Sequence, residues 1–297
     1  MSLVSKEMGI RANRLVKGDL GIEIEVEGRN LPTRVPLWRT EVDGSLKGEE
    51  SIEYVLQTPS SLEGVRDALN NLNFAYKSFN SRVDDTVRAG VHVHVNCQKL
   101  TMTQLYNFMT LYLLLENVLV KWCGDYREGN LFCLRACDAD YLLAVIQAAT
   151  EDDRKRFRQH FQTDDIRYAS MNLKALGDYG SLEFRAMRGT RDLDLIYTWA
   201  ETLLGLREFS SKFNSPNEII ESFSIDGPIN FMRNALGKNF DVFFDKDTEE
   251  LLHQGMRSAQ DIAYCTDWHK FEPKMKKIGN LEFPEDVDAP DEPLEDF

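Results

Sequence analysis

Short segments with alternating apolar and polar residues constrain the fold of this chain more than any other feature. In DLGIEIEVEG (residues 19–28), isoleucine or valine occupies every second position from Ile22 to Val26. Alternate side chains of a β-strand point to opposite faces, so one face of this strand is apolar. The other face carries the carboxylates of Glu23, Glu25 and Glu27. Neighbouring carboxylates about 7 Å apart repel by about 2 kcal/mol at an effective dielectric of 20, so such a row in a cleft favours a bound cation.

Three more segments alternate in the same way, and each carries functional side chains on its polar face. They are SIEYVLQTP (51–59), GVHVHVN (90–96) and GSLEFRAM (180–187). Their polar faces carry Glu53, then His92, His94 and Asn96, then Glu183 and Arg185. One apolar and one polar face per strand is typical of an antiparallel sheet that rests on a helical core and lines a site with its other face.

Segments with helical spacing of apolar residues fill the intervals between these strands. The expected helices cover about residues 60–79, 101–122, 139–149, 152–161, 192–213 and 248–264, with a short one opening at residues 215–218. Ser60 and Glu63 have the spacing of a capping box, as do Ser215 and Glu218. Strands scattered among many helices, without regular alternation, predict one α+β domain with a more helical C-terminal third.

The acidic balance of the chain argues against some classes of partner. With a net charge of -14 at pH 7, general binding to nucleic acids or anionic membranes is not expected, because both need a surface rich in lysine and arginine. Part of this charge lies in residues 284–297, where seven acidic residues and three prolines predict a disordered, solvated tail. The longest apolar run, residues 111–122, is too short to span a bilayer.

Cysteine usage indicates the compartment. The five cysteines are irregularly spaced, odd in number and mostly embedded in apolar sequence, as is typical of reduced thiols. No N-terminal stretch has the basic, apolar and small-residue order of a signal peptide. We therefore expect a cytoplasmic protein.

The two histidines of GVHVHVN change how the carboxylates are interpreted. A glutamate on a strand face is often simply exposed to solvent, but His92 and His94 place two imidazoles side by side, where a metal ion or a phosphate could contact both. Zinc hydrolases can use such a pair as well. The other candidate ligands are oxygen donors, and several glutamates with one histidine suit Mg2+ or Mn2+, which keeps open positions for phosphate oxygens. Asp43, in an Asp-Gly pair, is most simply a turn residue.

Arginines cluster near the last of the four strands. EFRAMRGTR contains Arg185, Arg188 and Arg191, and Arg127 and Arg167 are further candidates. Each alone is most simply a surface ion-pair partner. A glutamate and an arginine at alternate positions of one strand, however, allow one side chain to hold a metal ion and the other to hold a phosphate bound to that ion.

Taken together, these segments resemble the amidoligase branch of the glutamine synthetase and glutamate-cysteine ligase superfamily, many of whose members occur in phages and bacteria. The matching pieces follow the family's order over about residues 19–210. They are GIEIE (21–25), W-x4-DGS (38–45), the strand with Glu53, GVHVHVN (90–96), R-x2-N-x2-C (127–133), RYASMNL (167–173) and LEFRAMRGT (182–190). The resemblance implies an antiparallel sheet curved around a metal and nucleotide site.

The resemblance also implies an activity, namely ATP-dependent ligation of a carboxylate to an amine through an acyl phosphate. The implied ligands of Mg2+, or of Mn2+, are Glu23, Glu25, Glu53, His92 and Glu183. The implied catalytic residues are Arg185 on the transferring phosphoryl group, His94 on a phosphate, and Arg127. Looser assignments to nucleotide or substrate fall on Arg188, Asn96, Arg167, Asn130 and Asn172. The substrates would be small-molecule or peptide carboxylates and amines.

Two departures from the family limit what carries over. The spacing around Asp43 leaves open whether Asp43, Glu49, Glu50 or Glu53 completes the metal shell. The chain after Phe213 has no matching motif, and it is a candidate surface for self-association or a partner protein. We divide the chain into a catalytic domain (1–213), a helical extension packed on it (214–283) and the acidic tail (284–297). A metal-dependent hydrolase and an inactive binding protein on the same fold remain the alternative functions.

Overall fold

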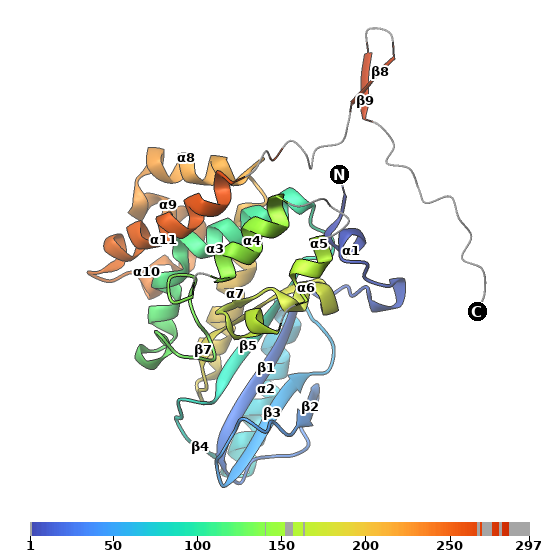
Figure 1. The fold of residues 1–297 in the computed structure, drawn as a ribbon. Coiled ribbons are helices and arrows are strands. Elements are labelled where there is room, and N and C mark those ends of the chain that lie inside the picture. The colour runs from blue at the N-terminus through green and yellow to red at the C-terminus, as the bar shows by residue number, and fades with distance from the viewer. Residues whose placement is uncertain are drawn as a thin grey trace, which may run out of the picture.

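The computed structural model describes residues 2–139, 141–151, 157–162, 164–265, 268, 275–278 and 281–284. Its centre is one curved antiparallel sheet of seven strands (Figure 1), which confirms the α+β class with a sheet packed by helices. The strand order is β2-β3-β1-β5-β7-β6, and β4 pairs with β1. The strands are β1 (Leu20–Arg29), β2 (Trp38–Glu41), β3 (Glu50–Leu56), β4 (Arg82–Val83), β5 (Gly90–Asn96), β6 (Met171–Asn172) and β7 (Ser181–Arg188).

The alternation seen in the sequence separates the two faces of this sheet. The apolar residues of β1, Ile22, Ile24 and Val26, are at most 1% exposed, and Val91 and Val93 of β5 are fully buried beside them. The glutamates and histidines of the same strands therefore point to the opposite face. The four predicted strands all form, with the expected face toward the core.

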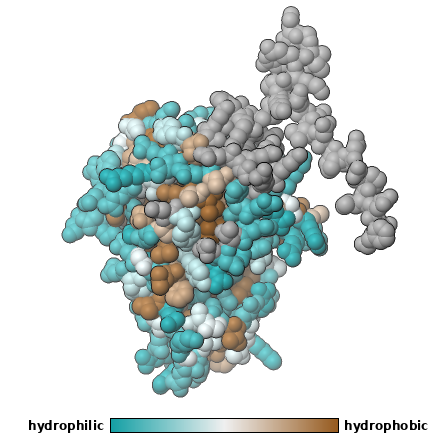
Figure 2. Space-filling view, viewed as in Figure 1, coloured by the Kyte–Doolittle hydropathy of each residue, from teal (hydrophilic) through white to brown (hydrophobic). Residues whose placement is uncertain are grey.

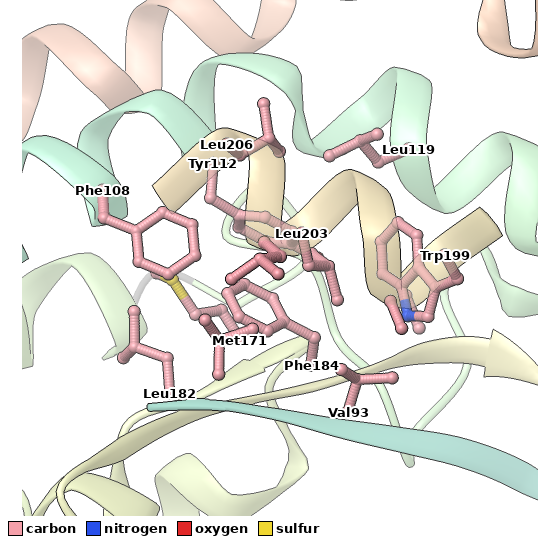
Figure 3. Close-up of a cluster of buried hydrophobic side chains, with 14 of the residues drawn as sticks. Val93, Phe108, Tyr112, Leu119, Met171, Leu182, Phe184, Trp199, Leu203 and Leu206 are labelled. Atoms are coloured by element: carbon pink, nitrogen blue, oxygen red, sulfur yellow. The ribbon is translucent and has the colours of Figure 1, made fainter. Parts of the chain in front are cut away.

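Helices cover the apolar face of the sheet. In Figure 3, Phe184 and Val93 of the sheet lie below Leu203 and Trp199 of α7 (Leu193–Ser210), and Leu182 lies below Phe108 of α3 (Met102–Cys123). The Phe184 ring also packs on Tyr112 of α3, with ring centroids 4.7 Å apart. The helices are α1 (Val4–Glu7), α2 (Leu62–Ser78), α3 (Met102–Cys123), α4 (Tyr141–Glu151), α5 (Phe157–His160), α6 (Lys174–Tyr179), α7 (Leu193–Ser210), α8 (Pro216–Asp226), α9 (Pro228–Leu236), α10 (Phe240–Phe243) and α11 (Thr248–Ala263). Short 3-10 turns are η1 (Ala12–Arg14), η2 (Asp125–Arg127), η4 (Asp165–Tyr168) and η5 (Gly237–Asn239).

The C-terminal helices pack on the buried helix α3. Gly255 of α11 allows the closest approach, because a Cβ atom there would lie 2.1 Å from the carbonyl oxygen of Leu114. Beyond α11, β8 (Met275–Ile278) and β9 (Leu281–Pro284) pair as a two-stranded sheet that the sequence patterns did not predict. Of the expected acidic tail, residues 285–297 lie outside the described residues, as do residues 152–156 of the expected helix over 152–161. In the described part of the chain, no helix is long and apolar enough to cross a membrane.

Both predicted capping boxes are wrong in detail. The N-cap of α2 is Ser61, whose hydroxyl accepts from the Gly64 amide at 3.2 Å. Ser60 does not cap the helix, because its main-chain amide and carbonyl both pair with Leu20 of β1. At α8, Ser215 is the N-cap but its side chain makes no capping bond; Glu218 instead accepts from the amide of Asn214 at 2.8 Å.

Strand β7 contains a bulge that the alternating pattern did not reveal. Val93 pairs with Phe184, but Val91 pairs with Met187, so two residues of β7, Arg185 and Ala186, lie opposite one residue of β5. Such a bulge reverses which later side chains face the core. Met187 is accordingly buried. In Figure 2, the face of the molecule seen in Figure 1 is mostly hydrophilic, with apolar residues in scattered patches.

Candidate functional site

Strand pairing gathers the predicted ligands into one row across the polar face of the sheet. Glu25 lies opposite Glu53 of β3, and Glu23 lies opposite His92 of β5. At the next step, Glu183 of β7 lies between His94 and Asn172, its register partners on β5 and β6. Residues from five strands and about 160 positions of sequence thereby converge at one place.

The converged side chains form two overlapping groups that could each hold a metal ion. Glu23, His92 and Glu183 make one group, and Glu25, Glu53 and His92 make the other. In each group the candidate ligand atoms all lie within 4.8 Å of one another. Around His92, Nδ1 is 3.4 Å from Glu23 and 3.6 Å from Glu183, and Nε2 is 3.7 Å from Glu25. A neutral imidazole has one free lone pair, so His92 can serve one group at a time.

The donor set fits a hard divalent cation. Carboxylate oxygens dominate both groups, and one nitrogen joins them. Oxygen-rich sites of this kind suit Mg2+ or Mn2+, whereas zinc sites usually combine more nitrogen or sulfur ligands. The four carboxylates of these groups lie close together, so a bound cation would relieve their mutual repulsion.

The pKa values of the cluster reflect this excess of negative charge. Burial and the nearby charges of Glu23 and Glu25 raise the pKa of Glu53 to about 8. Burial also raises the pKa of Glu25, against the charge of His92 and a bond from the Gly90 amide at 2.8 Å. Burial would raise the pKa of Glu23 as well, but its contacts with His92 and His94 outweigh that effect and hold this pKa well below its usual value. Within one cluster, the pKa of Glu23 is therefore lowered and that of Glu53 is raised.

Glu183 is held from both sides. It is 6% exposed, and the Asn172 amide donates to its Oε2 at 2.5 Å. Its Oε1 accepts from Nη1 of Arg185 at 2.5 Å, and the same Nη1 lies 3.3 Å from Nδ1 of His92. Burial opposes ionisation, yet the charges of His94, Arg185 and His92 lower the pKa of Glu183. Arg185 thus contacts two of the candidate metal ligands, Glu183 and His92.

A cavity of about 520 Å³ extends along the same face from Glu23. Away from the cluster it passes Gly21 and His94, which pair across β1 and β5, and then Asp19, just before β1, whose carbonyl accepts from the Asn96 amide at 2.8 Å. Its apolar walls are Val16, Ile22, Val55, Leu56 and Pro59. Its polar lining includes Arg14, Gln98, Asp178 and Tyr179, and the Tyr179 ring lies edge-on to His94 with the ring centroids 5.9 Å apart. An elongated ligand could therefore lie with one end at the metal groups.

His94 borders this cavity rather than joining the metal groups. Its Nδ1 lies 3.2 Å from Ser181 Oγ, and its Nε2 lies 3.4 Å from Glu23. Burial lowers the pKa of His94, but Glu23 and Glu183 raise it by more. An imidazole with a raised pKa beside the cavity suits the predicted contact with a phosphate.

Of the four carboxylates left open by the sequence, two lie at the cluster. Glu53 belongs to a metal group, and Asp43 lies beside Glu25, with its Oδ1 bound to the Ser45 amide at 2.6 Å. Glu49 is paired with Arg29 at 2.9 Å, and Glu50 accepts from the Leu31 amide at 2.9 Å. Glu49 and Glu50 are therefore bound by groups that do not belong to the cluster.

The other predicted binding residues are mostly engaged with the main chain. Asn96 donates to the carbonyl of Gly18 at 2.9 Å, and Arg188 donates to that of Cys123 at 3.0 Å. Asn130 bonds the carbonyls of Val87 and Tyr126, each at 3.3 Å. Arg167 is exposed and lies over the ring of Tyr168, 4.6 Å from its centroid. Arg127 is buried and bonds two carbonyls of β7.

Some residues of this region could not be found from the sequence pattern. Gln98 is buried and joins three segments of the cavity wall: it accepts from the Val16 amide at 3.0 Å and donates to the carbonyls of Arg14 and Tyr179 at 3.1 and 2.8 Å. A glutamine just beyond a strand gives no signal of such a role. Ser181, the partner of His94, was likewise only an ordinary strand residue in the sequence.

Comparison with known proteins assigns the chain to a family. A family model described as "Putative amidoligase enzyme" matches residues 33–206, more than half of the chain. The chain belongs to this amidoligase family. The matched region contains Glu53, His92, Glu183 and Arg185, whereas Glu23 and Glu25 precede it. Amidoligase membership makes a ligase-type enzyme the general class of the protein. No curated protein matches the chain.

Proposed function

We propose that the protein is an ATP-dependent carboxylate–amine ligase that forms an amide or peptide bond through an acyl phosphate. The observation that carries the proposal is the position of Arg185, in contact with Glu183 and His92 at the edge of two metal-ligand groups. An arginine beside metal-held phosphates is the arrangement that phosphoryl transfer needs. Membership of the amidoligase family supports a ligase.

The chemistry assigns a role to each of these side chains. A carboxylate resists attack by an amine because its leaving group would be oxide, whereas an acyl phosphate loses phosphate. Glu23, Glu25, Glu53, His92 and Glu183 would hold Mg2+ or Mn2+, which neutralises charge on the phosphates when bound. Arg185 would stabilise the phosphoryl group as it moves, by donating to its equatorial oxygens. Free amine then attacks the acyl carbon.

The cavity supports the nucleotide part of the proposal. Its wall from Glu23 to Asp19 covers about 13 Å of strand, close to the reach of a nucleotide from its last phosphate to its base. We place the phosphates at Glu23 and His94, and the base among the apolar walls near Val16 and Val55. Binding of this kind, apolar with a few polar groups, is usual for cofactor sites.

Geometry weighs against the hydrolase alternative. That alternative needs His92 and His94 on one metal ion. Among the described residues, both candidate metal groups include His92 and neither includes His94. The intact cluster likewise weighs against an inactive protein. We further propose that the enzyme acts in the cytoplasm on small-molecule or peptide substrates, with self-association or a partner protein through the helices after Phe213.

Trapping of the acyl phosphate tests the proposal. The protein is incubated with MgATP, hydroxylamine as a general amine, and a low-molecular-weight cell extract as the source of carboxylates, and products are analysed by mass spectrometry. We expect new hydroxamates and equimolar ADP and phosphate, both absent in Glu25→Gln. Metal-dependent cleavage of amides or phosphoesters that needs no ATP would instead indicate the hydrolase.

A further inference from the structure

The side chain of Arg127 is directed at the bulge of β7. Arg127 is 1% exposed, and it stands in η2, just after the turn at Gly124 that follows α3. Its Nε donates to the carbonyl of Ala186 at 2.8 Å, and its Nη2 donates to the carbonyl of Arg185 at 2.7 Å. These are the two bulge residues that face His92. Arg127 therefore supplies donors where the strand ladder is interrupted.

The bulge makes the main chain of Arg185 depend on partners outside the pairing of β5 with β7. A bulge leaves an extra residue outside the regular ladder, and its polar groups need other partners. Both main-chain groups of Arg185 have such partners: its amide donates to the carbonyl of Ser170 at 2.8 Å, and its carbonyl accepts from Arg127. Of these two partners, Ser170 uses its main chain and Arg127 uses its side chain. A shift of one residue would exchange the two faces of the strand.

We infer that Arg127 is a positioning residue, which holds the β7 bulge so that the guanidinium of Arg185 faces Glu183 and His92. This role differs from direct contact with a reacting group. Nη2 of Arg127 does lie close to the cluster. A Cβ atom built on Gly90 would be 3.4 Å from Nη2 of Arg127, and also 3.4 Å from Oε2 of Glu25 and from Nε2 of His92. A direct electrostatic effect on Glu25 is therefore the competing explanation that the experiment must separate.

The first test needs no enzymatic activity. In protein labelled with 15N- and 13C-arginine, the Nε–H signal of Arg185 is assigned by its loss in Arg185→Lys. We expect Arg127→Ala to shift or broaden this signal, and Arg127→Lys, which keeps a buried donor, to restore it in part. Arg135→Gln is the matched control, because Arg135 lies in the same connection but bonds Asp138 and Glu128. An unchanged Arg185 signal in a folded Arg127 variant would overturn the inference.

The second test rests on the proposed function and uses a double-mutant cycle in the hydroxylamine assay. If Arg127 acts through Arg185, then Arg127→Ala and Arg185→Ala each lower the rate by ~100-fold, and the double variant is no more than ~3-fold slower than either. Multiplying effects would show that Arg127 acts independently and would overturn the inference. If the wild-type protein shows no ATP-dependent activity, the proposed function fails while the signal of Arg185 still decides the role of Arg127.

Discussion

The side-chain amide of Asn172 donates to Oε2 of Glu183 at 2.5 Å, and both side chains are buried between two strands. Asn172 and Glu183 are register partners on β6 and β7, so the bond is fixed by strand pairing. The other oxygen of Glu183 faces His92 and Arg185. Asn172 thus orients a candidate metal ligand without belonging to a metal group.

This relationship predicts the effect of removing the amide. In Asn172→Ala, Glu183 keeps its charge but loses the donor that fixes its direction, so we expect Mn2+ affinity to fall about 10-fold. Titration followed by electron paramagnetic resonance measures the affinity. Asn239→Ala is the control, because Asn239 also donates to a carboxylate, that of Glu201 at 3.2 Å, but far along the chain in η5. Equal Mn2+ affinity in the two variants would show that Asn172 does not support the metal site.

A buried glutamate outside the site predicts how stability depends on pH. Glu116 of α3 accepts from the Ala136 amide at 2.8 Å and from the Ser170 hydroxyl, and burial raises its pKa to about 7. The folded protein keeps this proton to a higher pH than the unfolded chain, whose glutamate has a pKa near 4.5. The stabilising contribution is therefore complete below about pH 4.5 and is lost as the pH rises through 7.

Glu116→Gln should remove this dependence. We expect the free energy of unfolding of the wild type, relative to the variant, to fall by up to about 3 kcal/mol from pH 4.5 to pH 8. Urea unfolding at several pH values measures the difference. A difference that stays constant, or that grows with pH, would show that Glu116 does not carry the proton.

Two glycines in helices predict opposite changes in stability. Gly255→Ala in α11 places a methyl group 2.1 Å from the carbonyl of Leu114, so α3 and α11 must move apart, which costs about 1–3 kcal/mol. Gly205→Ala in α7 meets no atom within 4 Å and should stabilise the protein by about 0.5–1 kcal/mol through helix propensity. Thermal unfolding of both variants tests the pair. Similar melting temperatures would contradict the close packing of α3 and α11.

The alternation of apolar and polar residues predicted the strands well. The alternation of β1 is unambiguous because Ile22 and Ile24 pack on the core, and a one-residue error would bury Glu23 among them. The same reasoning identified the face that carries His92. The strand register could not be predicted. Glu25 pairs with Glu53, and these residues are nearly thirty positions apart in the sequence, so no local pattern fixes their pairing.

Features that depend on three-dimensional contacts were missed or misassigned. An arginine in R-x2-N-x2-C gives no sign that its donors reach the carbonyls of a bulge, so the contacts of Arg127 with β7 were not predicted. Ser60 matched a capping box, but pairing with Leu20 removed it from the helix. The cavity wall combines Arg14 with Tyr179, which lie on separate segments that Gln98 joins.

The central claim is that the carboxylate–histidine cluster forms the metal end of a nucleotide site. Calorimetric titration with a non-hydrolysable ATP analogue, with and without Mn2+, tests it most directly. We expect binding that requires Mn2+, weakens at least ~10-fold in Glu25→Gln, and is unchanged in Glu49→Gln, whose carboxylate pairs with Arg29 away from the cluster. No binding to the wild type, or equal binding without Mn2+ or in Glu25→Gln, would contradict the claim.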